Sequence, residues 1–410
     1  MKYKVVALGA LLTGLIFVFG CAGTGDLIKA EFNFDLKKYD EAIPFYEGYL
    51  AKQPNSVEAR SRLGFSYYKT GWLDEAISEF QTVLEIEPSE SSSTYYLGLA
   101  YLNKGDFKNA IQTWQGYRNE SQPIVEEEIR RQLTLLQIAN SHRKAIEALS
   151  EEKQLLAAKP DSNTVAICYY QDLSPDRSLD ALQKGIAAMV ISCLKKVRSL
   201  KVVERVRVQA LLDEMKLGKA NPVDLKVAMK VGKLLGAENV ILGNISAGSI
   251  KATTTIVSSL TDSVRSKSSV SVDKDKFFEL PTLITLDIAK QIGIRLTEDE
   301  SRAIGIPHTK IYEAAVYFGM AVEALDAEKW KDAKKFFGLA LKKDPAFSLA
   351  RQMSDFCPGE NFSSVSPVSS MSISRFSDIS ESAMNAAIAS QAESDAAAST
   401  GGGDGGGGGG

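Results

Sequence analysis

Small and aromatic residues recur near the N-terminus with a period of 34 residues, and this period constrains the fold more than any other feature. Each unit would carry a small residue on a first helix, a small residue on a second helix, and an aromatic residue one turn later. The three sets are Ala30, Gly64 and Gly98; Ala42, Ala76 and Ala110; and Tyr46, Phe80 and Trp114. Because small residues let paired helices approach closely, the pattern predicts a solenoid of helical hairpins.

This pattern resembles the tetratricopeptide repeat, and three such repeats are expected over residues 24–121. The resemblance implies a groove that is lined by fixed positions of the first helices and that binds a protein or peptide. In this chain the positions are Ser61, Phe65, Tyr68, Lys69, Tyr95, Leu99, Leu102 and Asn103. Members that hold a terminal carboxylate have asparagine where Phe65 and Leu99 stand, so an apolar peptide or helix is the expected ligand. The alternative is that some of these residues pack against the neighbouring helix or against the capping segment that follows the repeats.

The N-terminus has the pattern of a secretory signal peptide. Two lysines among the first four residues precede an apolar run over residues 5–19, which is too short to span a bilayer as a stable helix. The sequence Val-Phe-Gly-Cys at residues 18–21 resembles the bacterial lipobox. This resemblance implies a lipoprotein signal peptide over residues 1–20 and a lipid attached to Cys21.

The residue after this cysteine bears on the location of the protein. Ala22 stands where aspartate would favour retention in the inner membrane. The resemblance therefore implies a lipid anchor in the outer membrane, with the body of the protein facing the periplasm. An ordinary signal peptide and an uncleaved anchor are the alternatives.

The charge balance makes nucleic acid an unexpected partner. The 48 Lys and Arg residues and 51 Asp and Glu residues leave a net charge of −3, and loss of Lys2 and Lys4 with the signal would take it to −5. The sequence has no basic domain and no stripe of Lys and Arg, which nucleic-acid binding needs. A chain of 410 residues has room for two or three domains.

A second domain is expected after a helical connection. Residues 122–158 have a polar helical pattern that would cap the repeats and lead away from them, and Lys-Pro-Asp-Ser-Asn at residues 159–163 marks a boundary. Strands are then expected at residues 165–170, 200–204 and 240–245, helices at 179–197, 208–217, 223–235 and 283–296, and a hairpin within 250–272. This alternation predicts a layered α/β domain over residues 163–297.

Residues of this domain resemble the core of the CsgG-type domain, which is related to the amino-terminal domain of TolB. They are Val202, Val203, Glu204, Arg205, Leu211, Leu212, Asp213, Glu214, Leu217, Gly232, Leu235, Gly236, Ala237 and Gly243. We expect Gly236 to end a helix in the left-handed conformation and Gly243 to let a neighbouring element approach closely.

The CsgG resemblance implies an outer-membrane lipoprotein of curli secretion whose subunits assemble with one another. Members of that channel type insert two amphipathic hairpins per subunit into the bilayer. This chain has room for one hairpin, and Thr253, Thr255 and Ser259 on it are poor lipid-facing residues. The departure counts against a pore, while a homo-oligomer through this domain is expected.

The C-terminal part of the chain predicts one more hairpin and a tail. Ala333, Phe337 and Pro345 repeat the offsets of the repeat units, so a single helical hairpin is expected over residues 311–350. One unit cannot bury its own apolar face, so it would dock on the α/β domain or bind a partner. Residues 358–410 are rich in serine, alanine and glycine and are expected to be disordered.

The sequence offers no site for catalysis, for a metal or for a cofactor. His142 and His308 are expected to be solvated or to cap helices. Cys168 and Cys193 are expected to be small buried hydrophobes, with a disulfide between them as the alternative; Cys357 is the remaining cysteine. No phosphate-binding or dinucleotide-binding glycine motif occurs. We therefore do not expect an enzyme.

These features predict a scaffold rather than a catalyst. The expected protein is lipid-anchored, faces the periplasm, binds proteins through its repeats, and takes part in envelope assembly or in secretion such as curli assembly. The alternative is a subunit of a CsgG-type outer-membrane export channel.

Overall fold

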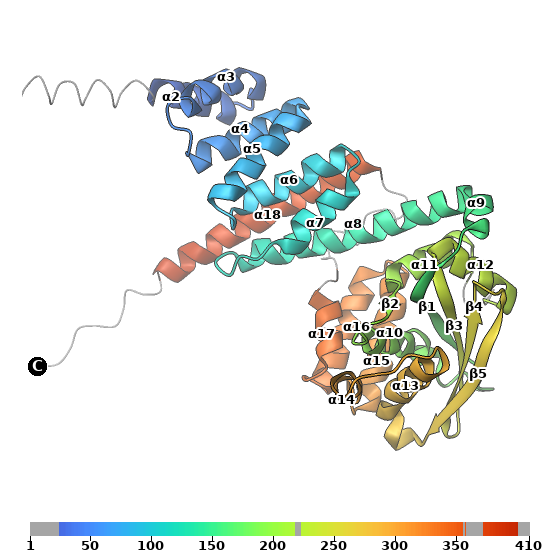
Figure 1. The fold of residues 1–410 in the computed structure, drawn as a ribbon. Helices are drawn as coiled ribbons and strands as arrows, with labels where there is room; N and C mark the ends of the chain where they lie inside the picture. The colour runs from blue at the N-terminus through green and yellow to red at the C-terminus, as the bar shows by residue number, and fades with distance from the viewer. Residues whose placement is uncertain (1–23, 218–222, 356, 358–371, 401–410) are drawn as a thin grey trace, which may run out of the picture. The chain divides into compact units, whose positions relative to one another are not determined.

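The chain forms two compact units. The computed structural model describes residues 24–217, 223–355, 357 and 372–400, and Figure 1 shows their fold. Unit 1 contains the described residues up to Leu133 together with those from Ser372 onward, and unit 2 is Thr134–Met371. The predicted signal peptide and Cys21 lie outside the described residues.

Unit 1 begins with three helical hairpins, as the 34-residue period predicts. Their helices are α2 (Thr24–Asp35), α3 (Tyr39–Leu50), α4 (Val57–Thr70), α5 (Leu73–Ile86), α6 (Ser91–Asn103) and α7 (Phe107–Gly116). Each small residue of a first helix is buried against its partner helix: a Cβ on Gly64 would lie 2.8 Å from the ring of Phe80, and Gly98 faces Trp114 in the same way. The fully buried Ala76 and Ala110 complete the close contact.

Unit 1 also contains two helices from outside the repeats. The first turns of α8 (Pro123–Ser150) belong to this unit, and α18 (Ile373–Thr400) joins it from the far end of the chain. The expectation of a disordered tail is therefore wrong for residues 373–400. Alanine is the best helix former, and Phe376 and Met384 give this helix an apolar face to bury. The other residues of the predicted tail, 358–371 and 401–410, lie outside the described part.

Unit 2 is built on a five-stranded sheet in the order β2-β1-β3-β4-β5. The strands are β1 (Asp161–Asp172), β2 (Lys201–Val202), β3 (Ala237–Ser246), β4 (Ile250–Ser258) and β5 (Ser263–Val272). β1 lies parallel to β2 and β3, while β3, β4 and β5 are antiparallel. This confirms the predicted α/β class, although the second strand has only two residues.

Helices cover both faces of the sheet. They are α9 (Glu152–Ala157), η1 (Asp180–Leu182), α10 (Gln183–Leu194), α11 (Arg205–Glu214), α12 (Leu225–Leu235), η2 (Lys274–Glu279), α13 (Leu280–Gln291), α14 (Glu298–Ile304), α15 (Tyr312–Asp326), α16 (Trp330–Lys343) and α17 (Ser348–Asp355). Val165 and Ile167 of β1 belong to one hydrophobic core, and Ala166 and Cys168 belong to the other. Burial on both faces explains why this strand reads as a continuous apolar run.

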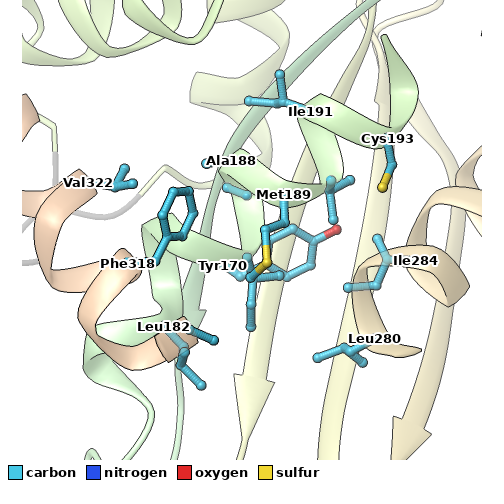
Figure 2. Close-up of a cluster of buried hydrophobic side chains, with 14 of the residues drawn as sticks. Tyr170, Leu182, Ala188, Met189, Ile191, Cys193, Leu280, Ile284, Phe318 and Val322 are labelled. Carbon is cyan, nitrogen blue, oxygen red and sulfur yellow. The ribbon is translucent and has the colours of Figure 1, made fainter. Parts of the chain in front are cut away.

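The larger core joins the sheet to α10, α13 and the C-terminal hairpin. Figure 2 shows Tyr170 of β1 among Met189, Ile284 and Phe318, which come from α10, α13 and α15. Gly243 allows this packing, because a Cβ there would overlap the ring of Tyr170. At the end of α12, Gly236 has a φ of +68°, the left-handed conformation expected from the sequence.

The hairpin formed by α15 and α16 is docked on the α/β domain. Gly319 of α15 lies so close to η1 that an added Cβ would overlap the carbonyl of Ala181, and a Cβ on Gly185 would lie 2.8 Å from the Gly319 Cα. The buried Asp326 also pairs with Lys184 (Nζ to Oδ2, 2.9 Å) and with Arg205. The hairpin predicted to dock or to await a partner is thus part of unit 2.

Candidate protein-binding groove

Helices α4 and α6 carry all eight residues that the sequence predicts for the groove of the repeats. Asn103 of α6 donates a hydrogen bond from Nδ2 to the Tyr68 hydroxyl at 3.1 Å. Ser61 Oγ accepts a hydrogen bond from Ser93 Oγ at 3.0 Å. Phe65 is half-buried, and its ring centroid lies 4.7 Å from that of Tyr96. The structure therefore brings the two predicted rows together.

Three of the predicted groove residues lie in the interior. Tyr95, Leu99 and Leu102 are at most 1% exposed, and the ring of Tyr95 stacks on Trp114 at 5.9 Å between centroids. These residues are packed as core in the present structure. The more accessible groove positions are Ser61, Phe65, Lys69 and Asn103. Whether any of the eight binds a partner stays a prediction.

Helix α18 occupies part of this groove. It packs against α6, as Figure 1 shows. Lys69 forms an ion pair with Glu381, and Ser377 Oγ donates a hydrogen bond to Asn103 Oδ1 at 3.0 Å. Two predicted groove residues therefore contact a helix of the same chain.

The first turns of α8 hold the other side of α18. Gln132 Nε2 donates to the backbone oxygen of Ser380 at 3.0 Å, and the backbone nitrogen of Ile124 donates to Gln391 Oε1 at 3.0 Å. These contacts lie eleven residues apart along α18, so the helix is held along about three turns. The groove thus holds an extended helical segment rather than a single side chain.

The buried face of α18 is narrow and made mostly of small side chains. Its buried residues recur every three or four positions, as one face of a helix requires. They are Phe376, Ser377, Ser380, Ala383, Met384, Ala387 and Gln391. Small residues allow the backbone of α18 to lie close to the repeats, while Phe376 and Met384 supply the large apolar contacts.

Burial raises the pKa of two phenols in the groove above the ordinary tyrosine value. Burial, with a smaller contribution from the nearby Glu381, raises the pKa of Tyr68 to about 12. Burial likewise raises the pKa of Tyr96, and Glu381 adds to that effect. Both hydroxyls therefore remain protonated near neutral pH, so they can donate hydrogen bonds.

The groove is open beside the C-terminal half of α18. A cavity of about 590 Å³ lies there. Its lining includes the aromatic residues Phe34, Phe65 and Tyr96, the acidic residues Glu58 and Glu87, and Asn385 and Ile388 of α18. Sequence reasoning missed Phe34, Tyr96 and the helix itself. The helical spacing of the apolar residues Phe376, Met384 and Ala387 is the sequence signal that predicts α18.

The described residues contain no candidate metal cluster, and the three cysteines among them are buried. No group of three or more His, Cys, Asp or Glu side chains in this part of the chain could hold a metal ion. Cys168, Cys193 and Cys357 are buried, and no disulfide joins Cys168 to Cys193. Burial raises the pKa of the Cys168 thiol to about 12 and also raises that of Cys193. Buried protonated thiols are poor nucleophiles.

Both histidines have structural partners in unit 2. The expectation of a solvated or capping role is wrong for His142, which is 8% exposed and whose Nδ1 lies 3.0 Å from Glu214 Oε1. His308 Nε2 lies 3.2 Å from the Met189 carbonyl and 3.5 Å from Cys193 Sγ. Burial lowers the pKa of His308 to about 4, so its ring is neutral near pH 7.

Comparison with known families identifies both parts of the chain. Residues 33–93 and 93–121 match models of the tetratricopeptide repeat, and residues 143–256 match the model for the curli production assembly/transport component CsgG. The chain therefore carries tetratricopeptide repeats followed by a CsgG domain. No curated protein matches it. Within the described residues, no helix has the length and apolar character needed to cross a membrane.

Two solved structures are similar in part. Yeast Tom70 has 17% identity to this chain, with 82% of this chain and 67% of that chain covered at a TM-score of 0.25. A structure of Naa15/Naa10 bound to HypK-THB has 12% identity, with 87% of this chain covered at a TM-score of 0.23. The match covers only 46% of the latter chain.

Proposed function

We propose that this protein is a lipid-anchored scaffold of the bacterial envelope that holds an amphipathic helix of a partner protein in the groove of its repeats. The observation that carries the proposal is α18, a helix of the chain itself, seated in that groove by Lys69, Asn103 and Gln132. A surface that binds one amphipathic helix has the shape to bind another of similar character. The expected ligand has small residues on its buried face and one or two large apolar anchors.

The contacts of α18 favour its replacement by a partner. The hydroxyls of Tyr95 and Ser380 are buried and have no hydrogen-bond partner among the described residues. A buried unsatisfied polar group costs about 1–3 kcal/mol, which offsets part of the free energy gained by docking α18. Release of α18 would return the Ser380 hydroxyl to water, and a partner helix that accepts a hydrogen bond from the Tyr95 hydroxyl would avoid the remaining cost.

The remaining parts of the proposal concern location and assembly. The CsgG match favours a protein of the bacterial envelope, and the lipobox-like sequence ending at Cys21 favours a lipid anchor with the body facing the periplasm. The CsgG domain would join copies of the chain, and the whole would serve envelope assembly or secretion without catalysis. An export-channel subunit is the second candidate because the matching model describes a transport component. Stable conductance of the purified protein in planar bilayers would favour that candidate.

Photo-crosslinking in intact cells tests the groove. A photoreactive residue in place of Phe65 would lie at the floor of the open groove, whereas one in place of Trp72, which is 55% exposed and outside the lining, serves as the control. We expect adducts with a partner at position 65 and not at position 72. The adducts should increase in a Met384→Ala variant, which weakens α18, and not in Ser390→Ala, which changes an exposed residue of the same helix outside the lining of the cavity.

Two outcomes would contradict the proposed function. Equal adduct patterns at positions 65 and 72 would show that the groove is not the binding surface. Adducts at position 65 that vanish in Met384→Ala would show that α18 is required for binding rather than replaceable by the partner.

A further inference from the structure

The first helix of the solenoid has a second apolar face that is exposed among the described residues of unit 1. Ile28, Phe32 and Leu36 follow one another at intervals of four residues and are 67%, 65% and 53% exposed. Four-residue spacing places them on one side of α2 and of the turn that follows it. The opposite side carries the fully buried Ala30, which packs into the hairpin. We call the three exposed residues the α2 stripe.

Charged side chains border the α2 stripe rather than interrupt it. Lys29 lies on one flank, where its Nζ is 5.4 Å from the ring centroid of Phe45, and Lys37 follows the last residue of the stripe. Asp35 lies on the other flank. A helix with an apolar face between charged flanks is suited to the boundary between lipid headgroups and acyl chains.

The predicted lipid on Cys21 would place the α2 stripe beside the bilayer surface. Cys21 lies three residues before Thr24, where α2 begins. Consecutive Cα atoms are about 3.8 Å apart, so the start of α2 lies within about 11 Å of Cys21 in any conformation. A lipid on Cys21 would therefore hold α2 at the bilayer surface.

We propose that the α2 stripe inserts into the surface of the membrane that holds the lipid anchor, so that α2 is an interfacial helix. The proposal rests on the lipid anchor of the proposed function. A second copy of the chain is the less suitable occupant, because a stable interface buries about 800 Å² on each partner, far more than three side chains provide. The contact would fix the first repeat against the bilayer and orient the groove relative to it.

Site-specific fluorescence on the lipidated full-length protein tests this inference. An environment-sensitive probe is attached to the new cysteine of a Phe32→Cys variant. The control is a Trp72→Cys variant, because Trp72 is also an exposed aromatic residue of the repeats but lies outside the α2 stripe. Selective labelling is feasible because Cys168, Cys193 and Cys357 are buried. The variants are reconstituted in vesicles of phosphatidylethanolamine and phosphatidylglycerol that contain lipids with spin-labelled acyl chains.

We expect the spin-labelled lipids to quench the probe at position 32 at least about threefold more than the probe at position 72, because an interfacial helix lies 5–10 Å deep. Equal quenching at the two positions, in protein that floats with the vesicles, would overturn this inference and leave the anchor intact. Protein that does not float would overturn the anchor and this inference together. In detergent, shielding of the probe at position 32 from solvent could instead increase with protein concentration. That result would assign the α2 stripe to contact with a second copy of the chain and would also overturn the membrane inference.

Discussion

Truncation of one buried side chain should release α18 from the repeats. Met384 has no exposed surface and is a large apolar residue on the buried face of α18. Replacing a buried methionine by alanine costs about 2–5 kcal/mol, because contacts are lost and a cavity remains. A cost near 3 kcal/mol shifts the docking equilibrium on the order of a hundredfold. The unsatisfied hydroxyls of Ser380 and Tyr95 offset part of the free energy that docking of α18 gains.

Hydrogen exchange measured by mass spectrometry reports this release. In Met384→Ala we expect backbone amides of residues 373–395 to exchange on the order of a hundredfold faster, while the repeats and unit 2 keep their protection. Ile388→Ala is the matched control, since Ile388 is 37% exposed and its truncation should cost less than about 1 kcal/mol. Unchanged exchange of α18 in Met384→Ala, or equal changes in the two variants, would refute the packing argument.

Four further predictions concern the anchor and the two units. Cys21→Ser should abolish incorporation of a fatty-acid probe and change membrane fractionation, because only a thiol accepts the diacylglyceryl group. Ala76→Glu should unfold the repeats at a cost of several kcal/mol and leave unit 2 folded, which calorimetry would show as loss of one transition. Gly319→Ala should lower the melting temperature of unit 2, because its Cβ would overlap the Ala181 carbonyl. The pKa of His308 is about 4 when folded and 6.5 when unfolded, so unit 2 should lose about 2–3 kcal/mol as pH falls from 6.5 to 4; His308→Gln should lack this loss.

The elements that the sequence predicts best are those specified by local patterns. The repeats follow from small and aromatic residues at one fixed spacing, and the pairing of Gly64 with Phe80 is the physical reason for that spacing. Strand β1 follows from its unbroken apolar run, which burial on both faces requires. Each of these signals lies within a few dozen residues.

The features that sequence reasoning missed depend on distant parts of the chain. Composition alone predicts disorder for the serine- and alanine-rich tail, but the spacing of Phe376 and Met384 lets 373–400 form a helix once the repeats supply a surface. His142 is polar and lies in a charged helix, so its sequence context predicts exposure. In the structure it is buried, and its ring contacts Glu214, which lies 72 residues later. The sequence predicts a groove that binds a partner. In the structure α18 occupies part of it, and the ion pair between Lys69 and Glu381 joins residues more than 300 positions apart.

Helix α18 lies at the C-terminal end of the described chain, so the order of synthesis determines when it can dock on the repeats. The repeats use contacts between neighbouring helices, so they can fold soon after their last residue is made. Unit 2 must wait longer, because its core joins Tyr170 to Phe318 and Phe337. Helix α18 is made after both. We therefore expect the groove to be complete but vacant until the C-terminal part of the chain has emerged across the membrane, so a partner present at that stage would bind before α18 closes the groove.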